Sequence, residues 1–413
     1  MSTEETTRDR AILRDLAKQY AEACQKEVQK ERRDLWRRHN SFHFTRPPIY
    51  IRAFAWREMA DSRCECEDPF FRGYEDFFRR MRFLDTVDDD YIFEPWVTVS
   101  AVRITPPGGI WGLPVKWERP AMATGAGVWD APIKEPEDLE RMVASDHVID
   151  EERTRQNVDR LHDAIGDILT ISVDRGPVYQ TFSGDISTHL AYLRGLEQIM
   201  WDMLDRPAFL HELLAFMRDG ILQTHQVAED KDDWALCNHQ NQAMPYAEEL
   251  DDPAANGGTV PRKQLWHFCA SQELTGVSAQ MFDEFMVQYQ RPIIEQFAMS
   301  AYGCCEDLTD KIDVLRQINN LRRIAVAPAA NVAKCAEQIG SDYILSYRPN
   351  PTDMVASDFD PERVRRILRR DFESCRGCCF DITLKDVETV QSDPERVRKW
   401  VQIVREVTEE VFG

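Results

Sequence analysis

Residues 297–350 read FAMSAYGCCEDLTDKIDVLRQINNLRRIAVAPAANVAKCAEQIGSDYILSYRPN, and this stretch repeats one unit of a short apolar run, a loop and an amphipathic helix. Apolar residues within 308–315 and 332–339 recur three and four positions apart, which places one apolar stripe along each helix. Residues 324–327 and 343–346 are largely apolar runs without alternation, as expected for parallel strands covered on both faces. The stretch therefore predicts a β/α repeat.

The same pattern extends over the rest of the chain. We expect eight strands, at residues 46–51, 90–97, 168–173, 264–270, 297–302, 323–327, 343–346 and 378–384. Eight strands alternating with helices predict an α/β fold of the (β/α)8 TIM barrel type over residues 45–413. The strongly charged residues 5–39 predict a helical extension, so residues 1–44 form an N-terminal helical arm that is either solvated or used in an oligomer such as a homodimer.

Composition limits the classes of partner. The formal net charge of the 413 residues is −21, which argues against nucleic-acid or anionic-membrane surfaces because both need a basic face. The longest uncharged apolar stretches are too short to span a bilayer. Eleven cysteines, with no recognisable signal peptide, are typical of reduced thiols. We therefore expect a cytoplasmic protein that acts on a small-molecule substrate.

Polar side chains follow several of the predicted strands. The carboxyl ends of parallel strands carry the chemistry of α/β enzymes, so these side chains are the candidates for a site. The residues expected to act in catalysis are Asp90, Arg175 and Lys385. Those expected to bind substrate are Arg52, Gln272, Tyr302 and Asn350.

Two of these candidates have a structural alternative. Asp90 belongs to a run of three aspartates, which is either an acidic turn or a place where one carboxylate points into a pocket with a shifted pKa. We expect Asp90 to face the barrel mouth near Arg175. Arg175 follows the strand 168–173 and suits the carboxylate of a substrate, although a pair with its neighbour Asp174 is the alternative.

A metal site is predicted at the adjacent thiols Cys304 and Cys305, with Glu273 as an oxygen ligand. Neighbouring residues of an extended chain point to opposite faces, so both thiols reach one ion only where the chain turns at Gly303. Zinc is the expected metal, because a thiolate-bound zinc with an open position activates a thiol or polarises a methyl donor. Two reduced cysteines packed beneath a loop are the alternative.

Three segments together resemble the uroporphyrinogen decarboxylase superfamily, which also contains zinc-dependent, cobalamin-linked methyltransferases. Residues 90–95, DYIFEP, are similar to the decarboxylases' Asp-Ile-Leu-Val-Val-Pro strand, whose Asp holds the tetrapyrrole. Residues 134–140, KEPEDLE, are similar to the helix start that follows, and residues 302–304, YGC, lie where the methyltransferases carry His-x-Cys. The resemblance runs from about Arg46 to the end of the chain and implies a (β/α)8 barrel with its site at the mouth.

Two departures from the family pattern leave the function open. Residues 52–57, RAFAWR, differ from the decarboxylases' Arg-Gln-Ala-Gly-Arg loop, and Tyr302 replaces the methyltransferases' histidine. The resemblance implies a zinc-dependent methyltransferase that moves a methyl group between a small donor and a corrinoid or thiol acceptor. A metal-independent, decarboxylase-like enzyme and a non-catalytic partner of a corrinoid protein are the alternatives. The chain has no Asp-x-His-x-x-Gly motif, so any cobalamin would arrive on a separate subunit.

Overall fold

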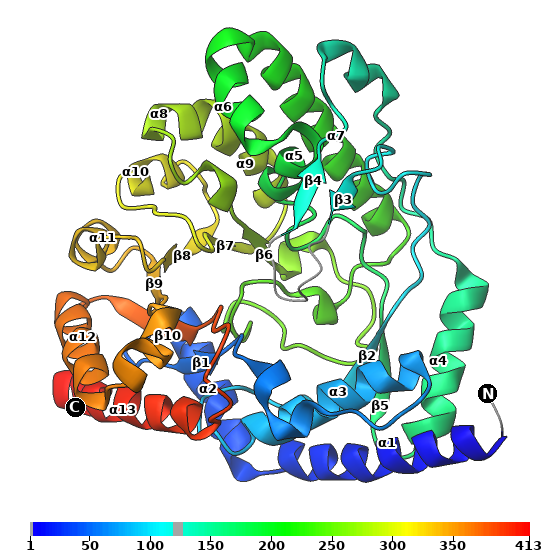
Figure 1. Ribbon diagram of the computed structural model, residues 1–413, viewed down its shortest axis with the longest axis vertical. Helices are drawn as coiled ribbons and strands as arrows, with labels where there is room; N and C mark the ends of the chain where they lie inside the picture. Colours follow the sequence, from blue (N-terminus) through cyan, green and yellow to red (C-terminus); the bar gives the residue numbers. More distant parts are fainter. Residues whose placement is uncertain (1–2, 119–126) are drawn as a thin grey trace.

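The computed structural model describes residues 3–118 and 127–413, and its centre is a curled parallel sheet (Figure 1). Six strands pair in the order β1-β10-β9-β8-β7-β6, and every pairing is parallel. Strands β2 and β5 form a second parallel pair, and β3 and β4 form an antiparallel hairpin. The strands are β1 (Ile49–Ile51), β2 (Trp96–Ser100), β3 (Lys116–Glu118), β4 (Val128–Asp130), β5 (Thr170–Asp174), β6 (Trp266–Cys269), β7 (Met299–Tyr302), β8 (Leu321–Val326), β9 (Ile344–Tyr347) and β10 (Cys379–Leu384).

Helices cover the outer side of the curled sheet, and β2 and β5 lie across its opening (Figure 1). The helices are α1 (Thr3–Cys24), α2 (Glu27–Asn40), α3 (Pro69–Leu84), α4 (Glu151–Ile165), α5 (Ser187–Arg194), α6 (Leu196–Asp205), α7 (Pro207–Asp230), α8 (Ala279–Phe282), α9 (Gln288–Ile294), α10 (Ile312–Leu315), α11 (Val332–Ile339), α12 (Pro361–Ser374) and α13 (Glu395–Phe412). Within the described ranges, none of them is both long and apolar enough to cross a membrane. The predicted α/β class is confirmed, with half of a barrel formed by continuous strand pairing.

Each of the eight predicted strands overlaps an observed strand. The bounds predicted for the strand at residues 90–97 are wrong. Residues 91–95 are not a strand, and β2 begins at Trp96. The carboxylates of Asp89 and Asp90 accept hydrogen bonds from the backbone N–H groups of Ile51 and Ile49, at 2.9 and 2.8 Å. Side chains therefore occupy the places that a neighbouring strand's carbonyl groups would take, and β1 and β2 do not pair.

The N-terminal arm packs closely on the rest of the protein. Helix α1 buries Leu13, Leu16 and Tyr20 in the main apolar core and lies along α3 and α4 (Figure 1). Helix α2 buries Trp36 and His39 at the amino-terminal ends of the strands, where His39 Nε2 lies 3.3 Å from the Asp381 carboxylate. The arm thus covers one end of the curled sheet, and the opposite end carries the residues that follow the strands.

Candidate functional site

Three basic residues follow three neighbouring strands at the carboxyl-terminal end of the sheet. Arg52, Lys385 and Arg348 come directly after β1, β10 and β9, which lie side by side in the sheet. Successive side chains of a strand alternate between its two faces. The last residue of β9, Tyr347, points outward and donates to Asp371 of α12, so the next residue, Arg348, faces the interior.

The ammonium group of Lys385 contacts both adjacent thiols. Its Nζ lies 3.1 Å from the Cys304 Sγ and 3.0 Å from the Cys305 Sγ, and the two sulfur atoms are 3.7 Å apart. Strands β9 and β8 separate β10 from β7 in the sheet, so this contact crosses the interior of the curl. The three side chains form what we call the thiol–lysine cluster.

A turn at Gly303 brings the two thiols to the same cation. Gly303 has a φ of +100°, which favours glycine, and a Cβ there would lie 2.8 Å from Leu308 Cδ1. The following N–H, of Cys304, donates to the buried carboxylate of Glu306 at 2.7 Å. The expected turn at Gly303 is therefore present, and it directs both sulfur atoms toward Lys385.

The thiol–lysine cluster favours one thiolate. The hydrogen bond from Cys305 lowers the pKa of Cys304, and the positive charges of Lys385 and Arg348 lower it further against the effect of burial. The hydrogen bond that Cys305 donates to Cys304 raises the pKa of Cys305. Burial opposes the charge of Lys385, but the neighbouring Cys304 keeps the pKa of Lys385 above its usual value. At neutral pH the cluster therefore holds a thiolate, a thiol donor and an ammonium ion, which is the setting of a reactive cysteine.

Arg348 is the most isolated cation of this region. Its side chain is 2% exposed, and its Nε and Nη1 atoms have no hydrogen-bond partner in the described part of the chain. Burial lowers the pKa of Arg348 to about 10, although the charges of Asp381 and Cys304 act in the opposite direction. A buried guanidinium with free donors is costly, and native proteins nearly always pair such groups.

Buried acids lie near the thiols. Glu306 accepts hydrogen bonds from the backbone N–H groups of Ser271 and Cys304. Burial, followed by the charge of Glu273, raises the pKa of Asp185 well above its usual range. Carboxyl groups with a strongly shifted pKa are a feature of sites that move protons.

The predicted catalytic residues do not all meet. Lys385 lies in the thiol–lysine cluster. Arg175, after β5, binds the carboxylates of Asp233 and Glu151. The alternative pair of Arg175 with Asp174 is not formed, because Asp174 pairs with Arg103.

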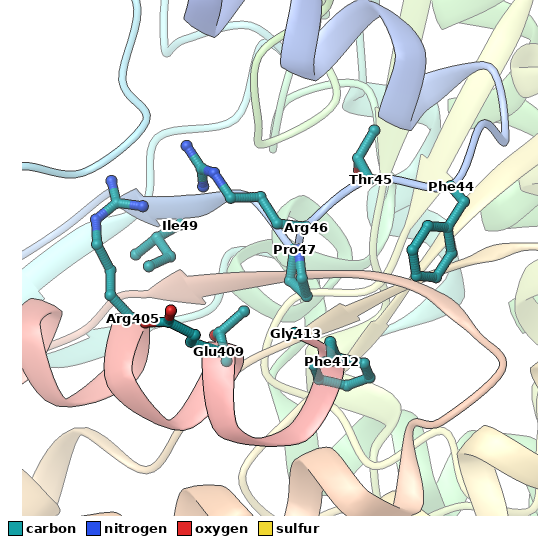
Figure 2. A pocket seen from close by; sticks show the side chains of 10 residues that line it. Phe44, Thr45, Arg46, Pro47, Ile49, Arg405, Glu409, Phe412 and Gly413 are labelled. Carbon is teal, nitrogen blue, oxygen red and sulfur yellow. The ribbon is translucent and has the colours of Figure 1, made fainter.

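Asp90 lies at the other end of the sheet and not at the mouth near Arg175. It is buried beside the first residue of β1 and forms ion pairs with Arg46 and Arg405, at 2.6 and 3.2 Å. Both arginines line a cavity of about 400 Å³ with Phe44, Pro47 and Phe412 (Figure 2). Burial would raise the pKa of Asp90, but these arginines lower it, so Asp90 is a charged structural residue.

Three of the predicted substrate-binding residues have local partners instead. Tyr302 ends β7 on the helix-facing side, and its hydroxyl donates to Gln290 at 2.6 Å. Asn350 caps the short helix at Pro351–Met354 by accepting from the Thr352 N–H. Gln272 donates only weakly, at 3.4 Å, to its neighbour Glu273. The fourth, Arg52, follows β1 and donates only to the neutral side chain of Gln242, at 3.1 Å.

The predicted metal ligands are only partly assembled. Cys304 and Cys305 share a cation, but that cation is Lys385. The carboxylate of Glu273 accepts from the hydroxyl groups of Ser187 and Thr188, at 2.6 and 2.8 Å. No group of three His, Cys, Asp or Glu side chains able to hold a metal occurs in residues 3–118 and 127–413. Catalytic zinc has three protein ligands, and the described residues as they stand do not bring three such ligands together.

Sequence reasoning selected Asn350 and passed over Arg348, two positions earlier in the same loop. The signal that could have found Arg348 is its place directly after a strand, which it shares with Arg52 and Lys385. Comparison with protein-family models and with curated proteins finds no match for this chain. Its function must therefore be argued from the site itself.

Proposed function

We propose that this chain is a methyltransferase that moves a methyl group from a small-molecule donor to a corrinoid or thiol acceptor through the Cys304 thiolate. The supporting observation is the thiol–lysine cluster, because a thiolate stabilised by Lys385 and Cys305 is both a nucleophile and a leaving group at neutral pH. We further propose that the eight strands form one (β/α)8 barrel with this cluster at its mouth. Asn238, in the segment between α7 and β6, donates to Asp174 at the end of β5.

The proposed transfer has two displacement steps. In the first, the Cys304 sulfur forms a bond to the methyl carbon while the bond from that carbon to the donor's heteroatom breaks. The heteroatom leaves with the electron pair and takes a proton, for which the Lys385 ammonium and the Cys305 thiol are the nearest sources. In the second, the bond from the methyl carbon to the Cys304 sulfur breaks as the methyl group passes to the acceptor, which would be a corrinoid or a thiol, and Cys304 leaves as a thiolate. The low proton affinity of Cys304 favours this departure.

A methyl-transfer assay tests this function. The wild type should transfer methyl from methylcobalamin to 2-mercaptoethanol, or the reverse, with S-methylation of Cys304 detected by mass spectrometry after a single turnover. The Cys304→Ala variant should lose the transfer. A matched control is Cys335→Ala, because Cys335 is a buried cysteine on α11. Transfer that persists in Cys304→Ala would refute the proposed role.

The sequence predicts a zinc site at Cys304 and Cys305, and metal analysis tests this prediction independently of the methyl-transfer assay. Protein purified without chelator or affinity tag should be analysed for metal in the wild type and in the Cys304→Ala, Cys305→Ala double variant. Stoichiometric zinc that is lost in a folded double variant would support the predicted site, with Lys385 displaced from the sulfur atoms. Zinc that survives both substitutions, or an absence of zinc from an active wild type, would reject it.

A decarboxylase-like enzyme is the second candidate, and it is favoured by Arg348, whose Nε and Nη1 have no hydrogen-bond partner among the described residues. Arg52 and Arg348 could hold the carboxylates of a substrate while a neighbouring acid supplies a proton to the carbon that loses carbon dioxide. Release of carbon dioxide from a panel of small carboxylic acids, dependent on Arg348 and independent of Cys304, would favour this reaction over methyl transfer.

A further inference from the structure

We infer that the substrate carries an oxyanion, a carboxylate or a phosphate, and that Arg348 and Arg52 form the subsite that binds it. This inference rests on the proposed function, because it concerns a ligand bound beside the Cys304 thiolate. The Nε and Nη1 atoms of Arg348 have no hydrogen-bond partner among the described residues, although Arg348 is 2% exposed. Donors that lack such a partner at this depth point to a ligand.

The charges around Arg348 are already committed to other groups. Asp381 lies in the same interior, but it pairs with Arg323 and accepts a hydrogen bond from Ser346 at 2.7 Å. Lys385 pairs with Asp386 at 2.8 Å and contacts the two sulfur atoms. Within residues 3–118 and 127–413, neither Arg348 nor Arg52 forms an ion pair with a carboxylate, and the guanidinium of Arg52 donates to Gln242 at 3.1 Å.

Two arginines in this arrangement favour an oxyanion over other ligands. A guanidinium group presents parallel N–H donors that match the two oxygen atoms of a carboxylate or phosphate. The surrounding protein is strongly acidic, with a formal net charge of −21, so a local excess of positive charge is not the average property of this chain. Burial, and to a smaller extent the charge of Arg52, lowers the pKa of Arg348, and a bound anion would offset both effects.

The subsite lies beside the thiol–lysine cluster, because Arg348 follows β9 and Lys385 follows the neighbouring strand β10. Arg348 lowers the pKa of Cys304, and the Cys304 charge acts on Arg348 in return. Cys305 and Asp386, which contact each other at 3.5 Å, are the exposed members of this region. An anion held by Arg348 would therefore lie at the same end of the sheet as the Cys304 sulfur.

Paired alkylating reagents test the subsite directly. Iodoacetate and iodoacetamide react with a thiolate in the same way: a carbon–sulfur bond forms and iodide leaves with the electron pair, but only iodoacetate is an anion. When the rate of each reagent with Cys304 is divided by its rate with glutathione, this ratio should be higher for iodoacetate than for iodoacetamide. The Arg348→Met variant should lower the iodoacetate rate roughly tenfold, the loss of one charge-assisted contact. At an equal fraction of Cys304 thiolate, the iodoacetamide rate of this variant should change less than about twofold. The pH profile of the iodoacetamide rate measures that fraction.

Competition identifies the kind of oxyanion. Acetate and inorganic phosphate, compared with chloride at equal ionic strength, should slow the alkylation of wild-type Cys304, and the more effective anion names the group that the substrate carries. Protection by neither anion, together with equal relative rates for the two reagents, would overturn the subsite. In that case rapid alkylation by both reagents at pH 6 would leave the thiolate of the proposed function intact.

A thermal measurement keeps the subsite testable if the thiolate itself is absent. Acetate or phosphate should raise the melting temperature of the wild type above that in chloride, and this increase should be lost in Arg348→Met and reduced in Arg52→Gln. An increase without rapid alkylation would support the subsite and reject the thiolate. Equal melting temperatures in all three salts would overturn the subsite whatever the reactivity of Cys304.

Discussion

Replacing Arg348 by methionine should stabilise the protein. Burial holds the pKa of Arg348 down to about 10, and at roughly 1.4 kcal/mol for each tenfold change in proton affinity this corresponds to about 3 kcal/mol. Methionine fills a similar volume without a charge or unpaired donors. We therefore expect the free energy of unfolding to rise by about 1 to 3 kcal/mol at pH 7. With roughly 2.1 cal/mol/K of unfolding entropy per residue, the melting temperature should rise by about 1 to 4 °C.

The control for this experiment is a buried arginine with a full set of partners. Arg194 is 3% exposed and donates to both carboxylate oxygens of Asp202, at 2.6 and 2.9 Å. Arg194→Met strands the buried Asp202 charge and should cost about 3 to 5 kcal/mol. Urea unfolding followed by circular dichroism, with calorimetry for the melting temperature, compares the two variants. If Arg348→Met destabilises the protein as much as Arg194→Met does, Arg348 is a structural residue and the reasoning is wrong.

Three further predictions follow from the titratable groups. The alkylation rate of Cys304 by iodoacetamide should stay high well below pH 8, and Lys385→Met should move its midpoint to higher pH because the thiolate loses a cation; a midpoint that does not move would exclude Lys385 as the stabilising charge. Burial raises the pKa of Asp89 to about 7 from 3.8, so the folded state binds more protons than the unfolded one and stability should fall as pH rises from about 4 to about 7. Asp89→Asn should flatten that slope in urea titrations across this range, and an unchanged slope would assign it to other groups. Asp90→Ala removes the acceptor of the buried Ile49 N–H and the partner of the half-exposed Arg46, so it should lower stability by about 1 to 3 kcal/mol, measurable as a loss of melting temperature, in contrast to the small effect expected of a substrate-binding residue.

The strands could be predicted because they carry their own signal. Residues such as 324–326 and 344–345 are buried on both faces, so their apolar runs need no knowledge of the neighbouring chain. The error at residues 90–97 has a different origin. There the acidic side chains of Asp89 and Asp90 bind the backbone of β1, a contact between segments about 40 positions apart that no local pattern reveals.

The site was predicted only in part, because it depends on which face each side chain takes. Cys304, Cys305 and Lys385 were selected correctly as neighbours of the strand ends, and their mutual contact needed the curl of the sheet. Tyr302 and Arg348 could not be placed in this way. A shift of one residue along a strand moves a side chain from the helix-facing side to the interior. Packing against α9 and α12 determines that Tyr302 faces the helices and Arg348 the interior.

The pairing of β1 with β10 places a constraint on how the chain is made. Strand β1 can pair with β10 only after β10 has emerged from the ribosome, and His39 can contact Asp381 only after another 342 residues have been synthesised. At a synthesis rate of roughly 5 to 20 residues per second, this delay is about 20 to 70 s. During that time one edge of β1 and the polar end of α2 have no final partner on the ribosome. The six-stranded sheet is therefore completed only after β10 has emerged, and a nascent chain stalled before β10 should depend on chaperones that shield unpaired strand edges.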